Sequence, residues 1–414
     1  MVNENFPLLT FGGTLNYYIF ELANFSIFGV SLLLLYRLKY ININSLIVWF
    51  GIFFTPLLFN YLIFSPYLFP DQFLYSSKVM SIKLEGTSWT DIIFEKRDAL
   101  NINLDNFSPI NTVSFSTKIL SFIPLVNYMT VTSMAFANKA ILFITFLWFK
   151  RFFKDENEIL AYFLVPSILV YSSLAIRDTI IIVLSIFFII NLIRGRWAWS
   201  LLFLLPLFIL KVQMFAILMI YFLAFVIFRA HKGRNLFLFF VVAFVILSLV
   251  FEDSILEILN RYRLAFIAED FVGIDGSRSY EAWNLYGDGQ DGIPKLNSIF
   301  EAILLGIQNL PILMLIPLPW NWSNIFYPIQ TFESLFLIYL FFYLSKKQKI
   351  YLDYQYLLLT FILIMGLSIY ALLLANEGTF VRYRFAMFYP FLISILYLSS
   401  QDYQRNVKPL KKGR

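Results

Sequence analysis

The chain of 414 residues is 60% hydrophobic and only 14% charged, and it contains 49 Phe residues. A water-soluble protein needs about a quarter of its residues charged to cover its surface, so this composition excludes a soluble globular protein and indicates a chain embedded in a lipid bilayer. The sequence contains no Cys, which excludes disulfides and thiol chemistry.

Apolar runs long enough to form helices recur along the chain. The first run lacks the basic residues and the cleavage site of a signal peptide, so we expect it to be retained. The pattern predicts an all-α, polytopic integral membrane protein with about eleven transmembrane helices in a single transmembrane domain, residues 1–414. The predicted spans are residues 14–36, 43–64, 127–149, 159–174, 178–193, 197–210, 213–228, 235–251, 325–344, 354–374 and 385–400.

Basic residues in the short connectors predict the orientation of the spans. Lys and Arg are concentrated after alternate spans, and such segments lie in the cytoplasm according to the positive-inside rule. The N-terminus is therefore predicted outside and the C-terminus inside. The net charge of +6 follows from this topology, and we expect no nucleic-acid partner. The clusters contain Arg37, Lys39, Lys150, Arg151, Lys154, Arg194, Arg196, Arg229, Lys232, Arg234, Lys346, Lys347, Lys349, Arg405, Lys408, Lys411, Lys412 and Arg414.

Two long loops are predicted on the outer side, over residues 65–126 and 252–324. The second loop contains a further apolar run, residues 299–319, with three prolines that disfavour a straight helix. If this run crossed the membrane, the basic connector at Lys346 would lie outside. We therefore expect residues 299–319 to form a re-entrant or interfacial segment.

Two short helical hairpins place cations at membrane depth. The runs on either side of Arg177 have about 16 residues each and reach about 24 Å, whereas the hydrocarbon layer is about 30 Å thick. The next hairpin turns near Lys211. Non-helical backbone at such depth lines a water-filled cavity or lies inside protein. The hairpins therefore predict an outward-facing cationic cavity. The alternative is that Arg177 pairs with Asp178 and that Lys211 extends to water.

Other charged residues suggest roles in binding or proton transfer. Lys139, inside the third predicted span, is a further intramembrane cation unless it extends to water. Arg382 and Arg384 lie in the last predicted outside turn, where two bidentate guanidinium groups would hold a diphosphate or, alternatively, anchor the helix at the lipid headgroups. Asp71 follows the second span, where it would act as a general base or remain a solvated loop residue.

The second outer loop combines charged and aromatic residues, among them Arg278 and Trp283. This composition suits sugar binding and equally an ordinary amphipathic cap. The single His of the chain, His231, lies in a predicted cytoplasmic connector, so a His-based metal site or catalytic triad is not available. No P-loop motif occurs in the sequence. We expect neither a metal nor another cofactor.

Three short segments together carry a family resemblance. They are Pro70-Asp71-Gln72-Phe73-Leu74-Tyr75, Tyr171-Ser172-Ser173-Leu174-Ala175-Ile176-Arg177-Asp178 and Arg382-Tyr383-Arg384-Phe385-Ala386-Met387-Phe388. In these segments, in its length and in its two outer loops, the chain resembles bacterial polysaccharide repeat-unit polymerases of the Wzy or O-antigen polymerase type. This family is related in architecture to the GT-C glycosyltransferases.

The resemblance implies metal-independent glycosyl transfer at the periplasmic face of the bacterial inner (cytoplasmic) membrane. The donor and the acceptor would be glycans linked to undecaprenyl pyrophosphate, and a chain-length regulator protein is a candidate partner. Arg177, Arg382 and Arg384 would hold the leaving pyrophosphate. Asp71 aligns with an acidic residue of many GT-C enzymes but lacks their adjacent second carboxylate, so the base stays open between Asp71, Glu377 and Asp178.

Lys211, Arg278 and Tyr75 complete the candidate substrate-binding set. Two other functions remain open at this point. A lipid-linked oligosaccharide flippase has a similar length and span count, although it needs two related halves, and the sequence shows no internal symmetry. An O-antigen ligase or another GT-C glycosyltransferase would use the same donor with a different acceptor.

Overall fold

The computed structural model describes residues 15–63, 72, 75, 79, 112–121, 123, 126, 130, 132–230, 250–257, 259–260, 296–322, 326–346, 353–373 and 377–400. Within these residues the chain is helical and contains no strand, which confirms the predicted all-α class. Four helices of this part of the chain are long and apolar enough to cross a membrane. They contain Phe20–Arg37, Ile43–Asn60, Tyr327–Lys346 and Tyr354–Leu372. The total number of spans and their orientation stay predictions.

The chain divides into two compact units, which are described separately. The first comprises Met1–Phe215 with Ser400–Arg414, and the second comprises Ala216–Ser399. The prediction of a single transmembrane domain is not tested by this division.

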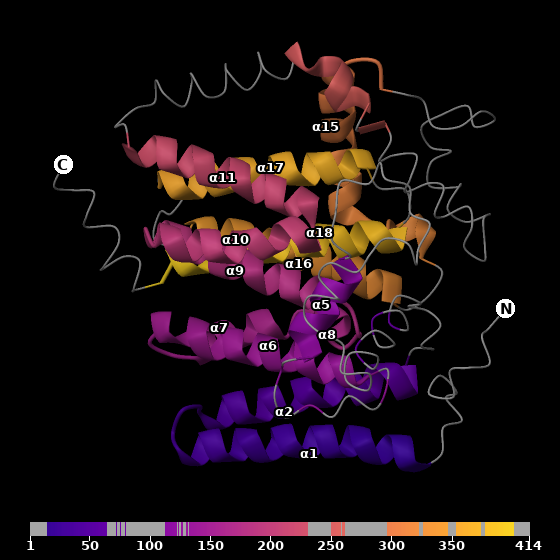
Figure 1. The fold of residues 1–414 in the computed structure, drawn as a ribbon, viewed down its shortest axis with the longest axis vertical. Helices are drawn as coiled ribbons and strands as arrows, with labels where there is room; N and C mark the ends of the chain where they lie inside the picture. Colours follow the sequence, from indigo (N-terminus) through magenta and orange to yellow (C-terminus); the bar gives the residue numbers. More distant parts are fainter. Residues whose placement is uncertain are drawn as a thin grey trace. The chain divides into compact units, whose positions relative to one another are not determined.

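Helices of the first unit pack against one another both as sequence neighbours and across intervening elements (Figure 1). Helix α1 packs against α2, α2 against α6, α6 against α9, and α9 against α10. Helix α5 falls within the predicted first outer loop, and it packs against α6 and α10. The elements are α1 (Leu15–Arg37), α2 (Ile43–Leu57), the π-helix η2 (Leu58–Ile63), α5 (Thr112–Ser121), α6 (Ser133–Phe149), the 3-10 helix η5 (Lys150–Phe152), α7 (Asn157–Phe163), α8 (Pro166–Ser172), α9 (Asp178–Ile193) and α10 (Trp197–Leu210).

The predicted span 159–174 is wrong as one continuous helix, because it forms the two seven-residue helices α7 and α8. Pro166 is the first residue of α8 and has no N–H to donate to the preceding turn. Its ring also disfavours helical backbone at Val165, which has φ −56° and ψ 127°. The interruption therefore follows from local sterics.

Aromatic side chains hold α2, α6 and α7 together. The Trp49 ring is fully buried, and its centroid lies 4.9 Å from that of Phe143, 5.3 Å from that of Phe146 and 5.5 Å from that of Phe163. The ring planes are tilted or edge-on, as the aromatic quadrupole favours. Part of the high Phe content therefore serves contacts between helices inside the unit.

In its described residues, the second unit contains four long helices and most of α11 (Val212–Ala230). Helix α17 packs against both α15 and α18. At Gly306 of α15, a Cβ atom would lie 3.0 Å from the carbonyl oxygen of Ser368, so the absence of a side chain permits the close approach to α17. The elements are α15 (Ile299–Leu315), the 3-10 helix η6 (Pro319–Asn321), α16 (Phe326–Lys346), α17 (Tyr354–Leu373) and α18 (Glu377–Leu398).

The end of α15 and the start of α18 differ from expectation in detail. Helix α15 continues through Pro311 and ends before Pro317. Whether this segment is re-entrant, interfacial or spanning stays a prediction. Helix α18 begins eight residues before the predicted start at 385 (385 − 377 = 8). Val381, Phe385 and Phe388 are buried at helical spacing, so the apolar face continues past the arginines that interrupt the run.

Candidate functional site at the Arg177 turn

The five residues 173–177 between α8 and α9 form an irregular turn inside the first unit. Ser173, Leu174, Ala175 and Ile176 are at most 2% exposed. Backbone N–H and C=O groups that leave the helical pattern in a buried position need other hydrogen-bond partners. Inside a membrane this requirement is stricter, because no lipid group can supply them.

Amide side chains from three other segments supply these partners. Asn138 of α6 donates through Nδ2 to the carbonyl oxygens of Leu174 (2.9 Å) and Ile176 (3.0 Å). Asn60 of the π-helix η2 donates to the carbonyl oxygen of Ser173 (2.7 Å). The Oε1 atom of Gln72 accepts from the N–H of Ala175 (3.0 Å). The turn is therefore held by side chains that are distant from it in the sequence.

Lys139 holds the end of α8. It is fully buried, so the alternative in which it extends to water is wrong. Its Nζ atom donates to the carbonyl oxygen of Leu169 (3.0 Å) and to Oγ of Ser172 (2.6 Å). The hydroxyl groups of Thr55 and Ser173 lie 2.8 Å apart and join α2 to the same turn.

Arg177 is the last residue of the turn and the N-cap of α9. Its side chain is half-buried, and its Nη1 atom is buried without a hydrogen-bond partner in the described structure. If Arg177 pairs with Asp178, as the alternative predicts, that pair does not involve the Nη1 atom of Arg177. Asp178 begins α9 and is 3% exposed, where a carboxylate is favoured by the helix dipole.

The length of α9 gives the distance between the Arg177 turn and the connector at the other end of this helix. Helix α9 has 16 residues and is about 24 Å long, less than the hydrocarbon thickness of about 30 Å. Arg194 follows its other end, and its guanidinium carbon lies 4.7 Å from the ring centroid of Phe152 in η5. Arg177 is thus separated from this connector by the length of α9, and its depth in the membrane stays a prediction.

Lys211 lies in the same unit as Arg177 and at a similar height along the α9–α10 hairpin. It is the half-buried, non-helical residue between α10 and α11, with φ −160° and ψ 88°. Helices α9 and α10 pack together and are joined by a short connector, and α10 has 14 residues against 16 in α9. Measured along the hairpin, Lys211 and Arg177 therefore differ in height by about 3 Å.

Among the described residues of the first unit, two buried charged residues were missed in the sequence. Lys118 of α5 is 1% exposed, on a helix that packs against α6 and α10. Glu21 of α1 is fully buried and accepts hydrogen bonds from Thr132 (2.5 Å) and Ser133 (3.4 Å) at the start of α6. A single carboxylate inside the first apolar run was the signal for Glu21. Lys118 was missed because the sequence predicts an outer loop over residues 65–126, whereas Lys118 lies in helix α5.

In the second unit, Arg384 is 5% exposed and bonded to the end of α15. Its Nη1 atom donates to the carbonyl oxygens of Leu313 (3.0 Å), Met314 (3.0 Å) and Ile316 (2.7 Å). These carbonyls lie where the helical ladder ends and partners are lacking, and a cation is favoured there by the helix dipole.

Arg382 is half-buried in the same helix as Arg384. The earlier start of α18 shows that the prediction of a turn at these residues is wrong, and their location on the outer side stays a prediction. Residues two apart in a helix do not face each other, so the two side chains point in different directions. Because these arginines belong to the second unit and Arg177 to the first, a cavity shared by all three stays a prediction.

The remaining predicted site residues are only partly described. Tyr75 is helical and 4% exposed. Glu377 is the first residue of α18, and its side chain lies outside the described part, as do Asp71 and Arg278 entirely. Among the described residues, no three metal-binding side chains form a cluster.

Comparisons of the chain with models of known protein families, with curated proteins and with solved structures find no match.

Proposed function

We propose that the chain is a membrane glycosyltransferase that polymerises oligosaccharide repeat units linked to undecaprenyl pyrophosphate at the periplasmic face of the bacterial inner membrane. The observation that carries this proposal is the buried Nη1 atom of Arg177, which has no hydrogen-bond partner among the described residues although other side chains hydrogen-bond the surrounding turn. A guanidinium group with an available N–H donor suits an anionic ligand, and phosphate oxygens match its geometry.

The proposed reaction concentrates negative charge on its leaving group. A hydroxyl group of the acceptor glycan attacks the anomeric carbon of the donor glycan, and the bond from that carbon to the pyrophosphate oxygen breaks. Undecaprenyl pyrophosphate departs with the bonding electrons, while the hydroxyl proton passes to a carboxylate. Fixed cations in a site of low dielectric constant stabilise the departing pyrophosphate without reorganisation.

Arg177 is assigned to the pyrophosphate, and Lys211 is assigned to the same group because it lies at a similar level of the α9–α10 hairpin. Arg382 remains a candidate ligand from the second unit. Arg384 is a weaker candidate, because its Nη1 atom is already bonded to three carbonyl groups. Asp178, beside Arg177, joins Asp71 and Glu377 as a candidate base.

The test uses full-length protein purified in detergent and a synthetic undecaprenyl-pyrophosphate-linked repeat unit, with and without chelator. We expect a ladder of polymer lengths that persists with chelator and that falls by about 10²–10³-fold in rate in the Arg177→Ala variant. Arg196→Ala is the matched control, because Arg196 is an exposed cation in the connector at the other end of α9. Equal rates in the two variants would overturn the assignment of Arg177.

The same preparation distinguishes the alternatives. In liposomes, transbilayer movement of the lipid-linked substrate without any change in glycan length would identify a flippase. Transfer of one preassembled glycan to a different acceptor, with no ladder, would identify a ligase or another GT-C enzyme. Either result would replace the polymerase proposal.

A further inference from the structure

A second polar site lies at the other end of α6 from the Arg177 turn. Lys139 and Lys150 are eleven residues apart on α6 and η5, which corresponds to about 16 Å along the helix. A hollow of about 730 Å³ opens here between the α1–α2 connection and the segment from η5 to α7. Five basic residues and two acidic residues line it: Arg37, Lys39, Lys150, Arg151, Lys154, Asp155 and Glu156.

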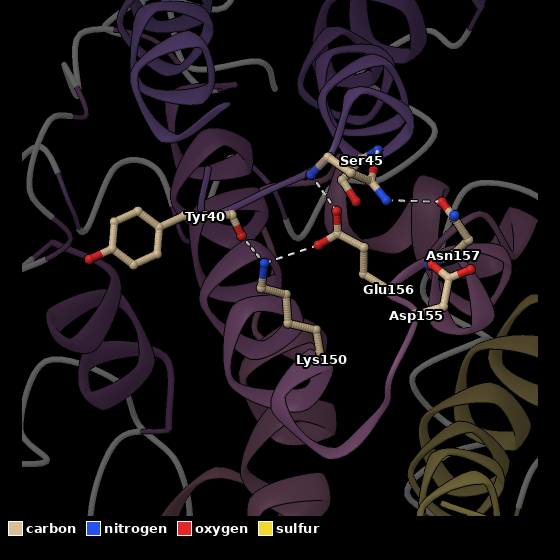
Figure 2. Close-up of polar contacts among 7 residues, drawn as sticks. Tyr40, Ser45, Lys150, Asp155, Glu156 and Asn157 are labelled. Carbon is tan, nitrogen blue, oxygen red and sulfur yellow. Dashed lines mark hydrogen bonds and ion pairs between the residues drawn. The ribbon is translucent and has the colours of Figure 1, made fainter. Parts of the chain in front are cut away.

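Hydrogen bonds tie the two walls of the hollow together (Figure 2). Lys150 donates through Nζ to the carbonyl oxygen of Tyr40 and pairs with Oε2 of Glu156 at 3.0 Å. The other carboxylate oxygen of Glu156 accepts from the backbone N–H of Asn42. Oδ1 of Asn157 accepts from Asn44 at 3.1 Å. These hydrogen bonds therefore fix the spacing between the two segments that form the walls of the hollow.

These bonds engage Glu156 and leave most of the positive charge available. The other acidic residue, Asp155, is exposed and accepts through Oδ1 from the backbone N–H of Asn157 at 2.9 Å. Within the described part of the chain, the exposed side chains of Arg37, Lys39, Arg151 and Lys154 form no ion pair. An anion entering the hollow would therefore meet cations from both walls.

Lys39 occupies a backbone position that favours Gly. After α1, the N–H of Tyr40 bonds the carbonyl of Leu35 and the N–H of Lys39 bonds that of Tyr36, and Lys39 has φ 58°. This is a Schellman motif with Lys39 in the left-handed position. Helix α9 ends in the same motif but has Gly195 there, with φ 77°. A lysine at this position costs stability that glycine would not, and Lys39 lines the hollow.

Exposed apolar and aromatic side chains border the same hollow. Tyr36 and Tyr40 line it and are 40% and 62% exposed. Leu38 between them is 66% exposed, and α1 also exposes Leu33 and Leu34 one turn earlier. Cations at a helix end beside tyrosines and an apolar helix face suit an amphiphile, with its headgroup in the hollow and its acyl chains along α1. A soluble anion without acyl chains would make no contact with this apolar surface.

We propose that the hollow between the α1–α2 connection and the η5–α7 segment binds the phosphate headgroup of an anionic membrane phospholipid. Arg37, Lys39, Arg151 and Lys154 contact the phosphate, and Tyr36 and Tyr40 lie at the boundary between headgroup and acyl chains. This site is separate from the Arg177 turn and does not depend on the proposed glycosyl transfer.

The test titrates full-length protein in detergent with phosphatidylglycerol or phosphatidylcholine and measures bound lipid by native mass spectrometry. We expect the double variant Arg151→Gln/Lys154→Gln to bind phosphatidylglycerol about tenfold more weakly, with binding of phosphatidylcholine unchanged. Arg196→Gln removes an exposed cation outside the hollow and is expected to leave both affinities unchanged. Equal binding of the two lipids, or equal effects of the two variants, would overturn the proposal.

Two further measurements test the role of Lys39 and distinguish a lipid from a soluble anion. Lys39→Gly removes a cation while relieving the left-handed position, so we expect weaker binding of phosphatidylglycerol together with an unfolding temperature that is unchanged or raised. A loss of binding accompanied by a lower unfolding temperature would overturn the role given to Lys39. Inorganic phosphate at the concentration of the lipid should not displace it, and displacement would identify a site for a soluble anion instead.

Discussion

The α8–α9 turn and the end of α15 both leave backbone carbonyl groups inside the protein, but different side chains satisfy them. At the end of α15, Arg384 itself donates to three carbonyl oxygens. At the turn, Asn138 and Asn60 donate instead, and the Nη1 atom of Arg177 has no partner in the described structure. Burial of an arginine near a helix end therefore does not identify a ligand site. The distinction lies in whether other donors already satisfy the local backbone.

The largest effect on stability is expected for Arg384→Ala. This variant leaves three carbonyl oxygens without the donor, and each unsatisfied buried group costs about 1–3 kcal/mol, so we expect a loss of about 3 kcal/mol or more. Arg177→Ala should change stability by less than about 0.5 kcal/mol, because it removes no such bond through Nη1. Unfolding of both variants in the same detergent measures the difference in stability. Similar losses would show that the two arginines do not differ in their contribution to the fold.

Asn138→Leu should have the next largest effect. The carbonyl oxygens of Leu174 and Ile176 lose their donor in a buried turn, which we expect to cost about 2–3 kcal/mol. The matched control is Asn191→Leu, since the one side-chain hydrogen bond of Asn191 within the described residues goes to the carbonyl oxygen of Phe187, one turn earlier in its own helix. A control loss as large as that of Asn138→Leu would show that the turn is not specially dependent on its amide partner.

Gly306→Val should displace α15, the helix whose last carbonyl groups accept hydrogen bonds from Arg384. The new side chain would meet the carbonyl oxygen of Ser368, and overpacking of this kind costs about 1–3 kcal/mol. If the displacement also weakens the bonds to Arg384, the double variant with Arg384→Ala will lose less than the sum of the single losses. Strict additivity in denaturant titrations would mean that the two contacts are independent.

Thr55→Val is expected to have the smallest effect. It removes the hydroxyl contact with Ser173 but retains the volume of the side chain, so we expect a loss of about 1 kcal/mol. Polymerisation should remain close to that of the unsubstituted protein, because Asn138, Asn60 and Gln72 still hold the turn. A loss of activity as large as that of Arg177→Ala would show that the hydroxyl pair positions Arg177.

The sequence by itself determined the helical class, the apolar character of the helices and the existence of a short hairpin with Arg177 at its tip. These properties depend on local composition and on the reach of a chain segment at about 1.5 Å per residue, which are readable without knowledge of distant contacts. It also identified Lys211 as a break between helices. It failed at 159–174 and at the start of α18, where a proline and a buried apolar face changed the helix boundaries.

Only the tertiary structure decided which charged side chains are engaged. Arg384 bonds to carbonyl groups about seventy residues earlier, and Asn138 to carbonyl groups about thirty-six residues later. Arg177 and Arg384 both occur as an arginine beside apolar residues, so their local sequences do not separate an available guanidinium group from an engaged one. Hydrogen-bond partners that come from remote segments are set by packing, and packing is a property of the folded chain.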